Sequence, residues 1–143
     1  MTRIDALLDR YGESHRHPVN KAIHWICVPL ITWSLLAALW AWTPVAAAAL
    51  IAAATVFYVR VSRSLALGML AVSALVVCPL PFFPTREVLL AVAAVVFAGA
   101  WIGQFIGHHI ERRRPSFVDD LAFLLVGPAW LLAFVYRRLG IRY

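Results

Sequence analysis

Charged residues are scarce in this sequence: they make up 14% of its 143 residues, while 63% are hydrophobic. A soluble domain usually has about 25% charged and about 45–50% apolar residues. So little polar surface cannot cover a globule in water, which excludes an ordinary soluble enzyme. The mean hydropathy of +0.81 agrees with this conclusion. We therefore expect a membrane protein that forms one compact domain over residues 1–143.

Cysteine is also rare, and the short motifs of many soluble enzymes are missing. Cys27 and Cys78 lie inside apolar runs, so we expect no disulfide framework, and their spacing fits no cysteine-based zinc pattern. No serine-nucleophile motif or P-loop is present, and the glycines from Gly99 to Gly107 lack the strand context of a dinucleotide fingerprint. The charged N-terminus has no apolar core, which is not typical of a cleavable signal peptide. These absences give no support to a nucleotide-dependent enzyme or a serine hydrolase.

Five apolar runs follow a short amphipathic segment. In residues 2–13, apolar side chains recur at helical spacing between charged ones, which predicts an amphipathic helix on the bilayer surface. The five runs are Ile23 to Trp42, Val45 to Val59, Leu65 to Phe83, Val88 to Gly107 and Leu121 to Tyr136. A bilayer core needs about 20 helical residues, a length that suits the first, third and fourth runs. Lipid offers backbone groups no hydrogen-bond partners, so each crossing is expected to be helical.

The basic residues between these runs predict the topology. If the N-terminus is cytoplasmic and four runs cross, the inner side receives Arg3, Arg10, Arg16, Lys21, Arg60, Arg63 and Arg112 to Arg114. Arg86 would lie outside, a distribution that satisfies the positive-inside rule. A fifth crossing would carry the C-terminal arginines outside, whereas Gly127-Pro128 allows the last run to kink and return. We therefore predict an all-α integral membrane bundle with an N-terminal amphipathic helix, four transmembrane helices and a C-terminal kinked or re-entrant helix.

All five histidines lie near the ends of two of the runs. His15, His17 and His24 precede or begin the first run, and His108 and His109 follow the fourth. The predicted topology puts both groups on the same side of the membrane. We therefore expect the fold to bring them together around a metal ion, because imidazole with carboxylate suits non-haem iron, zinc or copper.

Polar side chains accompany the histidines at helical spacing. Asn20 lies one turn before His24, and Gln104 and Glu111 lie one turn to either side of His108. Amides and carboxylates at such positions can hold the second nitrogen of a metal-bound imidazole. Polar groups at a membrane boundary are costly enough to indicate a function. The simpler alternative is that these histidines are interfacial or hydrogen-bonded packing residues.

Two motifs in the sequence resemble those of a known family. The pattern H-x2-P-x-N-x3-H-x3-V-P is formed here by His15, Pro18, Asn20, His24, Val28 and Pro29. A second block, WIGQFIGHHIERRRPSFVDDLAFLLVGP, runs from Trp101 to Pro128. Both resemble the signatures of the Mpo-like family of small membrane proteins, in the same order and with the same separation. The resemblance spans nearly the whole chain.

The resemblance implies an enzyme. The family's characterised fungal member is an iron(II)-dependent dioxygenase of fatty-acid α-oxidation that removes one carbon from a 2-hydroxy fatty acid. By resemblance, Fe²⁺ is the cofactor, held by His15, His24 and His108, with His17 and His109 as further candidate ligands. The substrates are then a 2-hydroxy fatty acid and O2, with no organic cofactor and no nucleic-acid partner.

Further residues are expected to act beside these histidines. The expected catalytic residues are Glu111, Asn20 and Gln104, and those expected to attract the substrate carboxylate are Lys21, Arg112 and Arg113. The membrane would be the inner membrane of a bacterium or the endoplasmic reticulum of a eukaryote. Two other classes remain open, a b-type haem protein with histidines on facing helices and a non-enzymatic lipid-binding protein. A transporter is the least favoured, because the sequence shows no inverted repeat.

Overall fold

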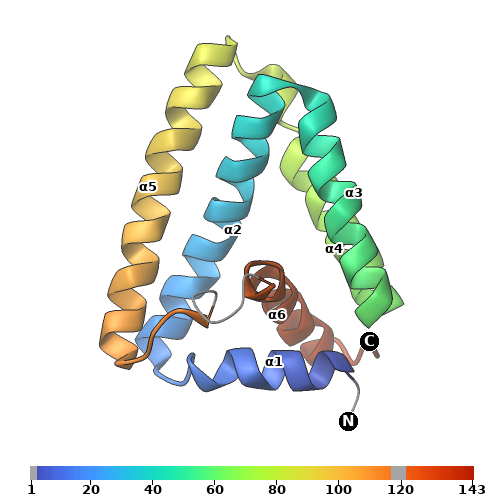
Figure 1. Ribbon diagram of the computed structural model, residues 1–143, viewed down its shortest axis with the longest axis vertical. Coiled ribbons are helices and arrows are strands. Elements are labelled where there is room, and N and C mark those ends of the chain that lie inside the picture. Colours follow the sequence, from blue (N-terminus) through green and yellow to red (C-terminus); the bar gives the residue numbers. More distant parts are fainter. Residues whose placement is uncertain (1–2, 117–121) are drawn as a thin grey trace.

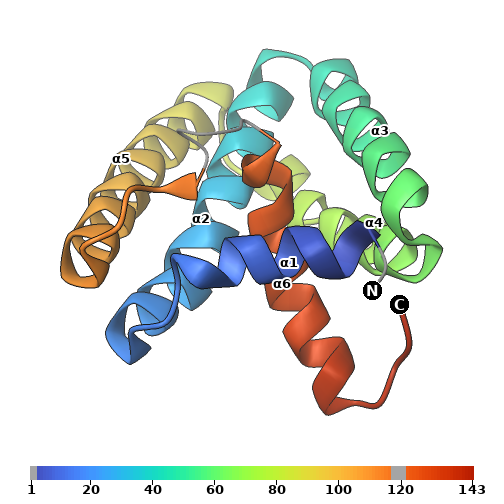
Figure 2. The same cartoon turned by 60° about the horizontal axis from the view of Figure 1, so that its bottom comes forward.

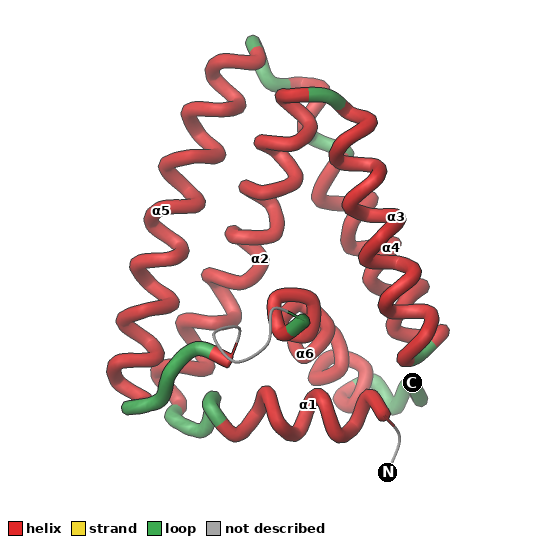
Figure 3. Tube along the Cα trace, viewed as in Figure 1, coloured by secondary structure: helices red, strands yellow, loops and turns green. Residues whose placement is uncertain are grey.

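The protein is all helical in the computed structural model, which describes residues 3–116 and 122–143. Its elements are α1 (Arg3–Glu13), α2 (Pro18–Trp42), α3 (Pro44–Val61), α4 (Arg63–Val77), the 3₁₀ helix η1 (Leu80–Phe82), α5 (Arg86–Glu111) and α6 (Phe123–Arg138). No strand occurs in these ranges (Figure 3), so the predicted all-α class is confirmed. Thr2 and Leu121, where the first and last predicted segments begin, lie outside the described residues.

Proline, threonine and serine divide the chain into these helices. Pro18 and Pro44 occupy the first turns of α2 and α3, where the missing N–H leaves no hydrogen bond unmade. Thr43, Ser62 and Thr85 cap α3, α4 and α5, since each side chain accepts a hydrogen bond from a backbone N–H of the following helix. A single capping residue separates α2 from α3 and α3 from α4, so these helices fold back on one another (Figure 1).

Four helical segments are long and apolar enough to cross a membrane. They are Pro18–Trp42, Pro44–Val61, Arg63–Phe82 and Arg86–Glu111. Their outer surfaces are apolar, because Val45, Leu67, Leu75 and Val95 are each 71–75% exposed, which suits contact with lipid. Helix α6 has 16 residues with Pro128 inside it, and it is not among these candidate spans. Four candidate spans plus two shorter helices match the predicted architecture.

The four long helices form two pairs that meet at one end and separate at the other (Figure 1). Helix α2 packs along α5, and α3 packs along α4. Helix α6 lies between the pairs at their open end, and α1 crosses it there (Figures 1 and 2). The apolar face of α1 is covered by protein, since Ile4, Leu8 and Tyr11 pack in one core with Phe123 and Val126.

Two glycines allow α2 and α5 to approach each other closely. A Cβ atom on Gly103 would lie 2.7 Å from Sγ of Cys27, and one on Gly107 would overlap Oδ1 of Asn20. A larger residue at either position would therefore push the two helices apart. Asn20 lies one turn before His24, and the residue after Gly107 is also a histidine. The close approach of the helices thus brings two histidines to the same place.

Candidate metal centre

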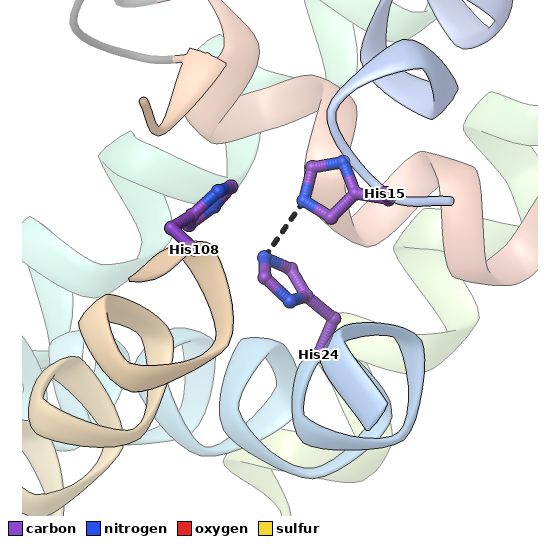
Figure 4. Close-up of side chains that lie close together, drawn as sticks. All are labelled: His15, His24 and His108. Carbon is purple, nitrogen blue, oxygen red and sulfur yellow. Dashed lines mark hydrogen bonds between the residues drawn. The ribbon is translucent and has the colours of Figure 1, made fainter. Parts of the chain in front are cut away.

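Three buried histidines from three segments meet at the open end of the bundle (Figure 4). His15 lies in the loop between α1 and α2, His24 in the second turn of α2 and His108 in the last turn of α5. One ring nitrogen of each lies within 4.8 Å of the others, and the three residues are 1%, 1% and 5% exposed. The structure therefore places a compact group of potential metal ligands inside the protein.

Backbone carbonyls decide which ring nitrogens of His15 and His24 face each other. Nδ1 of His15 lies 2.6 Å from the carbonyl oxygen of Tyr11, and Nδ1 of His24 lies 3.0 Å from that of Asn20. A carbonyl oxygen only accepts hydrogen bonds, so each imidazole donates from Nδ1. In the neutral ring Nε2 is then unprotonated and can bind a metal.

The two Nε2 atoms lie 2.8 Å apart and are joined by the dashed line in Figure 4. When both rings are neutral with their protons on Nδ1, neither Nε2 can donate, so two lone pairs face each other. This arrangement is repulsive unless a cation lies against them. Nδ1 of His108 is buried and has no hydrogen-bond partner among the described residues, and its ring centre lies 5.0 Å from each of the other two. The donor set therefore fits a divalent transition metal such as iron, zinc or copper.

Burial keeps His15 unprotonated at neutral pH. Loss of solvent lowers the pKa of its imidazole from 6.5 to about 4, although the hydrogen bond to the Tyr11 carbonyl acts in the opposite direction. The neutral ring is the form that binds a metal. The ring of Tyr11 stacks on that of His15 with 4.2 Å between centres, which restricts its orientation. Burial also raises the pKa of the Tyr11 phenol, which therefore stays protonated at neutral pH.

Hydrogen bonds to Glu111 connect the end of α5 to the loop that contains His15. Its carboxylate accepts hydrogen bonds from the backbone N–H groups of Arg16 at 2.9 Å and His17 at 2.8 Å, and from Nδ2 of Asn20 at 3.1 Å. These donors lie at the start of α2, where the helix dipole favours a negative charge. Glu111 thus joins the segments that bear the three histidines.

Asn20 and Gln104 are buried beside the histidines. Nδ2 of Asn20 also donates to the backbone oxygen of Ser14 at 3.1 Å, which ties α2 to the preceding loop. Gln104 is 6% exposed and lines the cavity that His24 and His108 border. The spacing of both amides in the sequence predicts these positions on their helices.

The other residues expected at the site lie farther out. His17 caps α2 by accepting a hydrogen bond from a backbone N–H, and both His17 and His109 are exposed and lie outside the histidine group. Lys21 and Arg112 are also exposed. Arg113 lines a polar cleft of about 230 Å³ at the same end of the molecule. These basic residues therefore lie at the same end of the molecule as the histidines.

Sequence reasoning missed several contributions to the site. Oγ of Ser14 lies 2.7 Å from Oγ of Ser116, which connects the loops that follow α1 and α5. Arg10 lines the polar cleft together with Arg113, although α1 is remote from α5 in sequence. The Tyr11 carbonyl orients His15, and no sequence signal marks it because every residue has a carbonyl group. Helical periodicity would have found only that Tyr11 is buried.

The sequence was compared with models of known protein families, and one of them matches nearly the whole chain. The family model described as 2-hydroxy-palmitic acid dioxygenase Mpo1-like matches residues 1–139. The chain belongs to this family. No curated protein and no solved structure gives a significant match. The family match confirms the resemblance carried by the two sequence motifs.

A small cavity lies beside the histidines of this Mpo1-like protein. It has a volume of about 60 Å³ and is bordered by His24, His108, Gln104, Tyr11 and Ser116. Most of its remaining walls are apolar side chains of α2, α5 and α6. Such a cavity can hold a small polar group against the histidines.

Proposed function

We propose that this protein is an iron(II)-dependent dioxygenase of fatty-acid α-oxidation, which cleaves C1 from a 2-hydroxy fatty acid with O2. The observation that carries the proposal is the pair of Nε2 atoms 2.8 Å apart, with the buried His108 beside them. A metal ion would bind both nitrogens and compensate their facing lone pairs, and the family description supplies the reaction class. Three protein ligands leave coordination positions free for a substrate.

His15, His24 and His108 would hold the iron, which supplies Lewis-acid and oxygen-activating chemistry when it is bound. The carbonyl groups of Tyr11 and Asn20 hold two of the imidazoles in the tautomer that binds a metal. The small cavity accepts the carboxylate and hydroxyl groups of a 2-hydroxy acid next to these ligands.

The proposed reaction needs no organic cofactor. A 2-hydroxy acid and O2 give the fatty acid that is one carbon shorter, together with CO2 and water, and the atoms balance. The C1–C2 bond breaks, and the hydroxyl-bearing carbon becomes the new carboxyl carbon. The substrate itself supplies all the electrons that reduce O2, so no external reductant takes part.

We also propose that the histidine end of the bundle faces the cytoplasm. Figure 1 places the start of α2, the turn between α3 and α4 and the end of α5 at this end. It therefore bears Lys21, Arg60, Arg63 and residues 112–114, while the opposite end bears Arg86. The positive-inside rule assigns the end rich in arginine to the cytoplasm. The same basic residues would attract an anionic fatty acid to the site.

Metal content and turnover of the detergent-purified protein test the proposal. His24→Ala and His108→Ala each remove a proposed ligand, so we expect both variants to lose bound iron and the conversion of 2-hydroxypalmitic acid. His109→Ala is the matched control, because His109 is exposed and lies outside the histidine group, and it should retain both properties. Iron retained at full stoichiometry in both ligand variants would contradict the ligand assignment. A wild-type protein that binds iron but converts no 2-hydroxy acid would contradict the reaction.

The geometry argues against the haem and metal-free alternatives. Two axial histidine ligands of a haem lie on opposite sides of its iron, which separates their nitrogens by about 4 Å at bond lengths near 2 Å. Nε2 of His15 and Nε2 of His24 are only 2.8 Å apart, and a cavity of about 60 Å³ has no room for a porphyrin. A metal-free lipid-binding protein would leave the two lone pairs opposed without compensation.

A further inference from the structure

A second cavity adjoins the small one beside the histidines, in the interior of the bundle. It is much larger, about 340 Å³ against about 60 Å³. Five residues line both cavities: Ile31, Thr32, Trp101, Leu124 and Pro128. Because they share these walls, the two spaces adjoin. We call the larger cavity the apolar groove.

The groove extends far from the histidines along two helices. On α2 the lining runs from His24 in the small cavity to Leu36 in the groove, and on α5 it runs from His108 to Phe97. At a rise of about 1.5 Å per residue, both stretches are about 17 Å long. A bilayer core is about 30 Å thick, so the acyl chains of one leaflet occupy about 15 Å. A chain that starts at the histidines and follows the groove would pass through the depth of one leaflet.

The walls of the groove present hydrocarbon. They come from α2, α3, α4, α5 and α6, and most are aliphatic or aromatic side chains. The hydroxyl of Thr32 donates to the carbonyl oxygen of Val28 at 3.0 Å, and that of Tyr58 donates to the carbonyl oxygen of Leu125 at 2.7 Å. These hydroxyl groups are already bonded, so the groove has little to offer a polar ligand. An alkyl chain is the occupant that suits such walls.

The groove is open at its side. Leu35 and Phe97 line it and are 43% and 41% exposed. Both belong to helices that are long and apolar enough to cross a membrane, so the exposed side would face lipid. A lipid chain can therefore enter sideways from the bilayer without passing through water.

We propose that the apolar groove holds the alkyl chain of the substrate, and that the small side chains of Ala54 and Ser73 in its wall leave the room that a long chain needs. The inference rests on the proposed function, because it takes the head of a 2-hydroxy fatty acid to lie at the histidines. Ala54 on α3 and Ser73 on α4 are small among larger lining side chains. The chain moves from lipid into an equally apolar groove, so the hydrophobic effect favours neither place. The fit of the chain in the groove then selects its length.

Chain-length profiles of variants with a filled groove test this inference. Ala54→Phe and Ser73→Leu add bulk from two different helices, so one variant suffices if the other does not fold. We expect each substitution to lower kcat/KM for 2-hydroxypalmitic acid about tenfold, which is the size of a typical overpacking penalty. The value of kcat/KM for the shorter 2-hydroxydecanoic acid should change less than about threefold. Ala53→Phe is the matched control, because Ala53 is exposed on α3 and does not line the groove, and it should keep the wild-type profile. An unchanged profile in the folded groove variants would overturn the proposal.

A binding measurement separates this inference from the proposed reaction. An analogue of 2-hydroxypalmitic acid with a terminal diazirine is added to the wild-type protein without O2 and illuminated, and the labelled peptides are identified. We expect label on the segments of α3 and α4 around Ala54 and Ser73, and less of it in Ala54→Phe. Label at these segments in a protein that converts no 2-hydroxy acid would support the groove and contradict only the reaction. Label confined to the outer surfaces would overturn the groove assignment even for an active dioxygenase.

Discussion

Replacing Glu111 with glutamine tests how the histidines are held in place. The carboxylate accepts hydrogen bonds from the N–H groups of Arg16 and His17 and from Nδ2 of Asn20, at 2.8–3.1 Å. Glutamine has nearly the same shape, but one oxygen becomes an NH2 group that faces a donor. The negative charge at the start of α2 is also lost. The substitution therefore removes at least one hydrogen bond without changing the volume of the side chain.

The expected magnitudes follow from these contacts. A hydrogen bond to a charged group contributes about 1.5–3 kcal/mol, and a charge at a helix end about 0.3–1 kcal/mol. Glu111 is partly exposed, so water replaces part of what is lost, and we expect the free energy of unfolding to fall by about 2 kcal/mol. Mutation of a group that orients a metal ligand typically lowers the metal affinity about 10–100-fold. Because Arg16 directly follows His15, we expect a loss of iron affinity in that range.

Metal titration separates positioning of the ligands from a simple loss of stability. Titration of the metal-free protein in detergent with Fe²⁺ or Co²⁺ gives the affinity, and the visible spectrum of the Co²⁺ form reports the arrangement of the ligands. Glu87→Gln is the matched control, because it is the same change on α5 at the end remote from the histidines, and it should leave both unchanged. A Glu111→Gln protein with wild-type Co²⁺ affinity and spectrum would refute the argument that this carboxylate positions the histidines.

The contact between α2 and α5 and the titration of His15 provide two more tests. Gly107→Ala puts a Cβ atom against Asn20, so we expect thermal unfolding in detergent to show a loss of about 1–3 kcal/mol. Gly99→Ala has nothing within 4 Å of the new Cβ atom and should leave stability unchanged or slightly higher; equal losses in both variants would contradict the close approach. The pKa of His15 is about 4 in the folded protein against 6.5 for the free side chain, so the unfolded state binds more protons between these values. The metal-free protein should therefore lose about 3 kcal/mol as the pH falls from about 6.5 to about 4. The free energy of unfolding, measured across this pH range, should show this loss. For His15→Gln it should depend less on pH. A wild-type stability that does not change with pH would refute a neutral, buried imidazole.

The helices are predictable from the sequence because lipid offers no hydrogen-bond partners to the backbone of an apolar segment. An apolar run in lipid can satisfy its N–H and C=O groups only as a helix, so the runs alone predict the all-α class. Capping residues such as Thr43 and Ser62 mark the ends through contacts with their immediate neighbours. The shared faces of Asn20 with His24, and of Gln104 with His108, likewise depend only on the geometry of one helix.

The choice among the histidines is not predictable in this way. His15 and His17 are two residues apart in a loop, where no periodicity applies. The structure turns His15 inward, where it is 1% exposed, and leaves His17 at the surface as a helix cap. The decisive contacts come from Glu111 at the end of α5. Its carboxylate accepts hydrogen bonds from the backbone N–H groups of Arg16 and His17. Spacing along the chain carries no information about contacts between segments so far apart.

Residue order alone is enough to predict helices that suit a membrane and histidines at their ends, because hydropathy and local spacing can be read along the chain. The burial of His15, His24 and His108 in one site and the 2.8 Å approach of two Nε2 atoms come from contacts between segments. The apolar groove lined by five helices depends on such contacts too. These features depend on how closely separate helices pack, and the packing is set by side chains that meet across the bundle rather than along the chain.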